Sequence, residues 1–196
     1  MPERIRHEKR VLFLGRVTFQ KGPEYFVEAA SLVLQRARNI RFVMAGSGDM
    51  LNAMINMAAE RGIADRFHFP GFMKGKQVYE VYKNSDVFVM PSVSEPFGIA
   101  PLEAMQCGTP SIISKQSGCG EILDKVIKTD YWDIHAMADA NAVALAVGIG
   151  MDQIVEALGV LERTRVAEEM KTLDQAARAT LQTVALHQRV STLTAR

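Results

Sequence analysis

The chain has 196 residues, which suggests one domain, or one domain with an appendage. Its formal net charge of +1 gives no broad electrostatic case for binding nucleic acid, and no apolar run approaches the roughly 20 residues that a membrane span needs. Two cysteines make no disulfide framework and no metal-ligand spacing is present, so we expect a cytoplasmic protein without a metal site, which meets a membrane, if at all, from outside the bilayer.

Short apolar runs alternate with helical patterns along the chain. The expected strands lie at residues 11–17, 40–46, 67–71, 86–92 and 110–114, with a weaker one at 124–129. The expected helices lie at residues 23–36, 49–61, 76–84 and 99–106. Strands that are apolar almost throughout suit a parallel sheet buried on both faces. The alternation predicts an α/β fold: a Rossmann-like, doubly wound parallel sheet of about six strands, followed by a helical tail.

Both ends of the chain depart from this alternation. The basic stretch RIRHEKR, residues 4–10, is interpreted as a solvated arm before the first strand. We divide the chain at residue 140 into a domain, residues 1–140, and an alanine-rich helical tail, residues 141–196. Apolar residues recur at helical spacing in this tail: Val166, Met170, Leu173, Ala177, Leu181 and Val184. This stripe is interpreted as a helix packing back on the domain, with partner binding and self-association as alternatives.

Small or glycine-bearing loops follow nearly every expected strand. They lie at residues 15–22, 45–50, 70–76, 91–98 and 114–120. In a parallel sheet these loops share the edge at which the strands end, and ligands of open α/β sheets bind there. The loops therefore predict a backbone-lined crevice, although a single glycine in a loop would indicate only a turn.

Two cations lie in the first of these loops. Arg16 and Lys21 flank a short turn, and Gly22 opens the next helix. Cations beside a helix N-terminus suit a phosphate or diphosphate. The spacing fits neither common glycine-rich phosphate motif, and ordinary surface charges remain the alternative.

Two glutamates frame the start of a helix in SEPFGIAPLEAM, residues 94–105. Pro101 suits a first helical turn, so Gly98 precedes the helix and leaves free N–H groups toward the crevice. Glu103 can accept two hydrogen bonds from a vicinal diol such as a ribose, and Glu95 can accept bonds from a hydroxylated ligand beyond the phosphates. Alternatively, Glu103 only stabilises the helix dipole and Glu95 is a solvated loop charge.

Together these features describe a site for a nucleotide-sugar, and they resemble a known family. GRVTFQKG, AGSGD, PGF and above all SEPFGIAPLEAMQCGTPSI resemble the C-terminal, donor-binding domain of retaining GT-B glycosyltransferases, the group 1 enzymes that include glycogen synthase and sucrose synthase. The resemblance covers about residues 11–140. It implies a hexosyltransferase that uses a nucleotide-sugar without a metal, with leaving-group charge stabilised by cations and backbone dipoles.

The resemblance also implies roles for individual residues. Arg16 and Lys21 would bind the diphosphate and stabilise the leaving group, and Glu95 would lie near the donor sugar; these three form the predicted catalytic set. Glu103 would bind the ribose. The remaining predicted donor-binding residues are Gly15, Gly46, Gly71, Phe72 and Met73, with the last three near the base, and Phe97, Gly98 and Ile99, which would offer backbone N–H groups.

The family's enzymes have a second Rossmann-like domain that carries the acceptor site. Only about ten residues precede the first expected strand here. We therefore expect a donor-binding part that is inactive without its N-terminal acceptor domain or a partner chain. The alternatives are a non-catalytic nucleotide-binding or assembly module and one half of a nucleotide-sugar epimerase.

Overall fold

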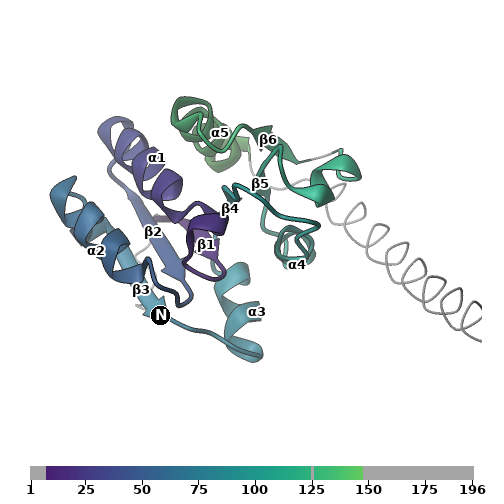
Figure 1. Ribbon diagram of the computed structural model, residues 1–196. Coiled ribbons are helices and arrows are strands. Elements are labelled where there is room, and N and C mark those ends of the chain that lie inside the picture. The colour runs from purple at the N-terminus through teal and green to yellow at the C-terminus, as the bar shows by residue number, and fades with distance from the viewer. Residues whose placement is uncertain (1–7, 125, 148–196) are drawn as a thin grey trace, which may run out of the picture. The chain divides into compact units, whose positions relative to one another are not determined.

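The computed structural model describes residues 8–124 and 126–147, and one parallel sheet organises them (Figure 1). The described part holds six strands, in the order β3-β2-β1-β4-β5-β6. They are β1 (Lys9–Leu14), β2 (Ile40–Ala45), β3 (Phe67–Gly71), β4 (Val87–Met90), β5 (Ser111–Ser114) and β6 (Ile127–Thr129). The predicted Rossmann-like sheet is therefore confirmed. The predicted stripe between Val166 and Val184 lies outside the described residues.

Helices cover both faces of the sheet (Figure 1). They are α1 (Pro23–Arg36), α2 (Leu51–Glu60), α3 (Lys76–Lys83), α4 (Ala100–Gln106) and α5 (Ile134–Val147), with short 3-10 turns η1 (Phe19–Lys21), η2 (Ala64–Arg66) and η3 (Gly118–Glu121). Helices α1, α2 and α5 share one apolar cluster with alternate strand residues such as Val11 and Phe13. The residues between these point to the opposite face, where α3 and α4 lie. Helix α5 continues past residue 140, the predicted end of the domain.

Phe26 anchors α1 to the sheet. Its ring centroid lies 5.6 Å from Phe13 of β1, 5.7 Å from Phe42 of β2 and 6.1 Å from Phe67 of β3. The side chain is 1% exposed, so it contributes a large apolar area to the core. Because Phe26 lies in the first turns of α1, this packing also fixes the loop that leads from β1 into the helix.

The strand order reverses between β1 and β4. The chain runs outward from β1 through β2 to β3, then returns to β4 on the other side of β1. The loops after β1 and β4 consequently leave the sheet toward opposite faces, and the gap between them is where ligands of such sheets bind. The topology therefore places the loops with Arg16 and with Glu95 at this point.

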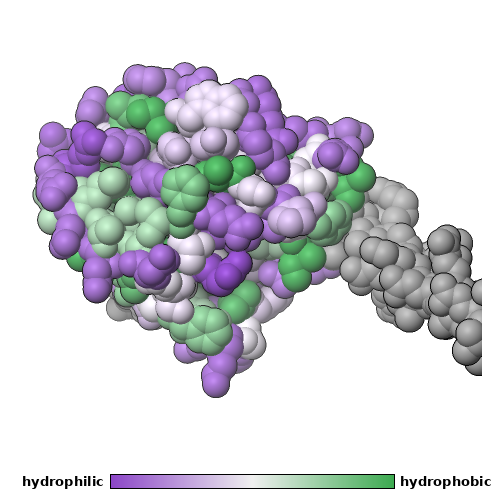
Figure 2. Space-filling view, in the orientation of Figure 1, coloured by the Kyte–Doolittle hydropathy of each residue, from purple (hydrophilic) through white to green (hydrophobic). Residues whose placement is uncertain are grey.

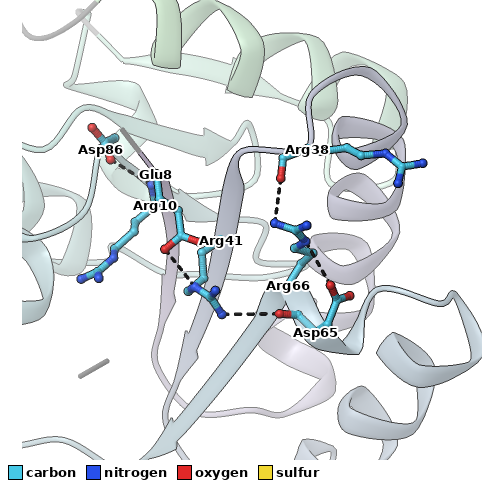
Figure 3. A network of polar contacts seen from close by, with 7 residues as sticks. All are labelled: Glu8, Arg10, Arg38, Arg41, Asp65, Arg66 and Asp86. Carbon is cyan, nitrogen blue, oxygen red and sulfur yellow. Dashed lines mark hydrogen bonds and ion pairs between the residues drawn. The ribbon is translucent and has the colours of Figure 1, made fainter. Parts of the chain in front are cut away.

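The prediction of a solvated N-terminal arm is wrong for residues 8–10. Strand β1 begins at Lys9, and Glu8 and Arg10 are 3% and 2% exposed. The Arg10 backbone N–H donates to Asp86 Oδ2 at 2.8 Å, and the Arg41 guanidinium contacts Glu8 at 3.0 Å (Figure 3). A guanidinium from β2 thus meets the Glu8 carboxylate, and a carboxylate from the residue before β4 binds the Arg10 backbone, which no local pattern reveals.

Candidate functional site

A pocket of about 440 Å³ opens at the carboxyl ends of β1 and β2. Its lining brings together five of the predicted site residues, namely Gly15, Arg16, Gly46, Phe72 and Met73, with Leu14, Ala45 and Ser47. The volume lies in the range of roughly 300–1,000 Å³ that is usual for small-molecule sites. Segments 15–16, 45–47 and 72–73 therefore form one concave surface.

Backbone hydrogen bonds hold the loops around this pocket in place. The Gly15 N–H donates to Ala45 O at 3.0 Å, and the Gly46 N–H donates to Gly71 O at 2.8 Å. The Val17 N–H donates to Ser47 O at 2.9 Å. Each bond joins loops from neighbouring strands, so the pocket wall is built by the sheet edge rather than by one mobile loop.

The two cations of the first loop have different surroundings. Arg16 is exposed at the pocket, and its Nη2 lies 3.4 Å from the neutral amide oxygen of Gln20. Lys21 is only 22% exposed and forms an ion pair with Glu95. Burial lowers the pKa of Lys21, and the Arg16 cation lowers it further. The loop therefore concentrates positive charge at the gap between β1 and β4.

The Lys21–Glu95 contact joins the loops after β1 and β4, and sequence reasoning did not anticipate it. The same loops are joined through their backbones, since the Val93 N–H donates to Gln20 O at 3.0 Å. Glu95 O in turn accepts from the Gly118 N–H at 3.0 Å. Glu95 is thus held by Lys21 and by Gly118, and its carboxylate lies beside the Lys21 ammonium.

Gly98 lets the chain turn from Glu95 into α4. Its φ is +82°, and a Cβ there would lie 2.9 Å from Glu95 Cγ. Helix α4 begins just beyond, with Ile99 as its N-cap. The described part of the chain shows no protein acceptor for the N–H groups of Phe97, Gly98 and Ile99. These three predicted residues therefore present unpaired donors at a helix start.

Glu103 lies in the first turn of α4, as expected, and is half-buried. The hydroxyl of Tyr82, from α3, lies 3.3 Å from its Oε2. Tyr82 is a neighbour of the site that sequence reasoning missed, because its position in a helical pattern indicated only a core aromatic residue.

Several exposed apolar side chains lie on the loops of this edge. Phe72 is 72% exposed, Phe19 63% and Ile99 57%. Hydrophobic and hydrophilic residues are mixed over the face shown in Figure 2. Large apolar side chains left in water beside a pocket are typical of ligand-binding grooves.

The described residues present neither a metal-binding cluster nor a membrane-spanning helix. No group of three or more His, Cys, Asp or Glu side chains there is arranged to hold a metal ion. Among the helices of the same residues, none has the length and apolar character required to cross a membrane.

Comparison with known proteins identifies the family. Residues 3–144 match the family model described as glycosyl transferases group 1, so the chain belongs to this family. A glycosyltransferase of Methanocaldococcus jannaschii is 45% identical over 116 residues, which are 59% of this chain and 30% of the relative. The 2-deoxystreptamine N-acetyl-D-glucosaminyltransferase of Niallia circulans is 28% identical over 165 residues, 83% of this chain and 41% of the relative. The chain thus spans less than half the length of these relatives.

Solved structures share the fold. A sucrose-phosphate synthase from Thermosynechococcus elongatus superposes with a TM-score of 0.76 at 25% identity, covering 88% of this chain and 46% of that one. The C-terminal domain of a glycosyl transferase group 1 family protein from Francisella tularensis gives a TM-score of 0.65 at 21% identity, covering 76% of this chain and 80% of that one. Anabaena HepE, solved with UDP and glucose, gives 0.73 at 19% identity, covering 85% and 49%.

Proposed function

We propose that this chain is the donor-binding part of a retaining hexosyltransferase and binds a nucleoside diphosphate sugar across the gap between β1 and β4. The observation that carries the proposal is that the Arg16 pocket and the Lys21–Glu95 pair both lie on loops at the carboxyl edge of the sheet, next to the gap between β1 and β4. Together they offer a cavity, two cations and a carboxylate, which suits a base, a diphosphate and a sugar.

Each part of the ligand has complementary groups in this proposal. The base lies by Phe72 and Met73, whose apolar surfaces line the pocket. Arg16 and Lys21 contact the diphosphate and stabilise its charge as the sugar departs, so the step needs no metal ion. Glu95 accepts hydrogen bonds from the sugar hydroxyls, and Glu103 accepts them from the ribose.

Diphosphate binding must replace the Lys21–Glu95 ion pair in part. Lys21 is partly buried, and burial makes its charged form less favourable without an anion nearby. In the ligand-free protein Glu95 supplies that anion. When a diphosphate arrives, Lys21 exchanges one anionic partner for another, and the Glu95 carboxylate becomes available to the sugar.

The match covers 30% and 41% of the length of the two relatives named above, so most of each relative has no counterpart in it. The cavity and the cations described here account for donor binding. We therefore propose that the purified chain binds donors and transfers sugar only when an acceptor domain is supplied.

Isothermal titration with UDP, GDP and ADP and their hexose conjugates tests donor binding. UDP is the first choice because HepE, which has the same fold, was solved with UDP. At least one nucleotide should bind without added metal and equally well in EDTA. Arg16→Ala and Lys21→Met should each weaken binding about tenfold or more, since each removes a charge-assisted hydrogen bond.

Arg38→Ala is the matched control for the loss of a cation. Arg38 is exposed in the turn before β2, at the opposite edge of the sheet, so its loss should leave nucleotide affinity unchanged. Equal weakening by Arg38→Ala would show that binding is non-specific. Absence of binding by all three nucleotides would overturn the proposal, and robust transfer by the chain alone would overturn the need for an acceptor domain.

A further inference from the structure

Tyr82 places a buried hydroxyl against one of the proposed ligand-binding carboxylates. Its oxygen lies 3.3 Å from Glu103 Oε2, across the contact between α3 and α4. We propose that Tyr82 is a positioning residue, which orients Glu103 to accept hydrogen bonds from the vicinal hydroxyls of a ribose. This inference rests on the proposed function. It adds a residue that determines the preference for a ribose over a deoxygenated sugar in the nucleotide.

The surroundings of Tyr82 leave its hydroxyl little freedom. The side chain is 1% exposed, and its ring packs edge-on against Phe88 of β4 with centroids 5.5 Å apart. Its backbone oxygen accepts a hydrogen bond from Thr109 Oγ1 at 2.7 Å. Ring and backbone are therefore both fixed by the core, so the hydroxyl has a fixed position beside Glu103.

The direction of the hydrogen bond is also fixed. Burial raises the pKa of Tyr82, and the Glu103 charge and the hydrogen bond to it raise it further. The phenol therefore keeps its proton throughout the physiological range and donates to Glu103. A phenol has a single O–H, so the bond to Glu103 uses its whole donor capacity.

Only one oxygen of Glu103 is held in this way. Oε2 contacts Tyr82, whereas the described residues provide no recorded partner for Oε1. A carboxylate with one anchored oxygen loses less freedom when a ligand binds, which improves affinity without a new ligand contact. The 3.3 Å separation is long for an O–H···O bond, and we expect it to shorten when ribose hydroxyls order the carboxylate.

Tyr82→Phe removes the hydroxyl and keeps the ring. The experiment measures Kd for the best-binding diphosphate among UDP, GDP and ADP, and for its 2′,3′-dideoxy analogue. The wild-type chain should prefer the ribonucleotide, and Tyr82→Phe should reduce this preference by about 2- to 10-fold, the effect of ordering one side chain. The ratio is taken within one variant, so a lower folded fraction does not change it.

Tyr79→Phe is the matched control, because Tyr79 lies on the same helix, is 49% exposed and faces Lys83 rather than Glu103. It should leave the preference unchanged. In a Glu103→Ala background Tyr82→Phe should have no further effect. An unchanged preference in Tyr82→Phe, or a full effect without Glu103, overturns the inference. If the wild-type chain binds the nucleotide but shows no preference for ribose, the inference fails while the proposed function stands; if it binds none of the three, the proposed function fails first.

Discussion

Cations at the amino edge of the sheet, where the strands begin, have different partners from cations at the carboxyl edge, where the strands end. At the amino edge, cations meet carboxylates that other elements bring to them: Arg41 contacts Glu8 (Figure 3), and Lys9 contacts Asp86. At the carboxyl edge, the recorded side-chain partner of Arg16 is a neutral amide, and Lys21 pairs with Glu95, which is itself one of the proposed ligand-binding residues. The two edges therefore differ in the partners of their cations rather than in residue type.

Breaking the amino-edge network should give the largest change in stability. Arg41→Met leaves the Glu8 carboxylate, which is 3% exposed, without its guanidinium partner. Removing one member of a buried pair strands a desolvated charge, so we expect a loss of about 3 kcal/mol in unfolding free energy. Urea unfolding measures this loss, and nucleotide affinity of the folded chain should not change.

The double variant Glu8→Gln/Arg41→Met shows how much of the stability loss comes from the lost ion pair and how much from the buried, unpaired Glu8 carboxylate. A neutral amide is less costly to bury than a carboxylate, so the double variant should be more stable than Arg41→Met alone. If Arg41→Met leaves stability within about 0.5 kcal/mol but weakens nucleotide binding, the contrast between the edges is wrong.

Local pattern predicted the elements of this fold well. The bounds of α1 and β3 agree with the prediction to the residue, because Pro23 marks the helix start and apolar runs mark the strands. Strand β1 begins two residues earlier and ends three residues earlier than expected. The start differs because the charge of Arg10 favours a solvated arm in the prediction. The end differs because residues 15–17 leave the strand and form hydrogen bonds with the end of β2 and the loop after it.

Contacts between distant side chains could not be predicted in the same way. The sequence separately indicated Lys21, Glu95 and Glu103, which lie in η1, in the loop after β4 and in α4. The pairing of Lys21 with Glu95 and of Tyr82 with Glu103 depends on how loops and helices meet in space. Neither contact leaves a periodic or local trace in the sequence.

Gly98→Ala tests the carboxyl edge through backbone strain. The left-handed conformation at φ +82° costs a residue with a Cβ about 1–2 kcal/mol. The added methyl group also displaces Glu95, which should weaken binding of a nucleotide-sugar more than binding of the free nucleotide. Calorimetry with both ligands measures the difference.

Gly62→Ala is the control for this change at the other edge. Gly62 has a φ of +68°, and a Cβ there meets nothing within 4 Å. Gly62→Ala should lose a comparable unfolding free energy, and its affinities for the nucleotide-sugar and for the free nucleotide should not change. Equal loss of sugar affinity in the two variants would show that strain, rather than contact with Glu95, is responsible.

The pH dependence of binding sharpens the role of Lys21. Burial and the Arg16 cation lower the pKa of Lys21 below the value of about 10.4 that is usual for lysine. Lys21 therefore loses its proton at a lower pH than an ordinary lysine. Affinity for a nucleoside diphosphate should therefore fall as the pH rises through this lowered pKa. Lys21→Arg stays charged and should show a flatter alkaline profile. Parallel profiles for the two proteins would exclude Lys21 as the titrating contact.

The smallest expected effect lies at His68, beside the amino-edge network. Burial lowers the pKa of His68, and the charges of Arg41 and Arg10 lower it further. The unfolded chain takes up a proton near pH 6.5, whereas the folded chain does so at lower pH, so stability should fall as the pH drops through this window and stay level above it. The loss should be below about 1 kcal/mol, because the side chain is only half-buried and solvent screens it.

Urea unfolding at pH 7.5 and 5.5 measures this difference in the wild-type chain and in His68→Gln. The glutamine variant should lose less stability on acidification, because it has no imidazole to protonate. Arg41→Met should also reduce the acid-dependent loss due to His68, since one of the charges that lower its pKa is gone. If acidification lowers the stability of His68→Gln as much as that of the wild-type chain, then other groups cause the loss. The charges of Arg41 and Arg10 would then have no effect on stability through His68 of β3.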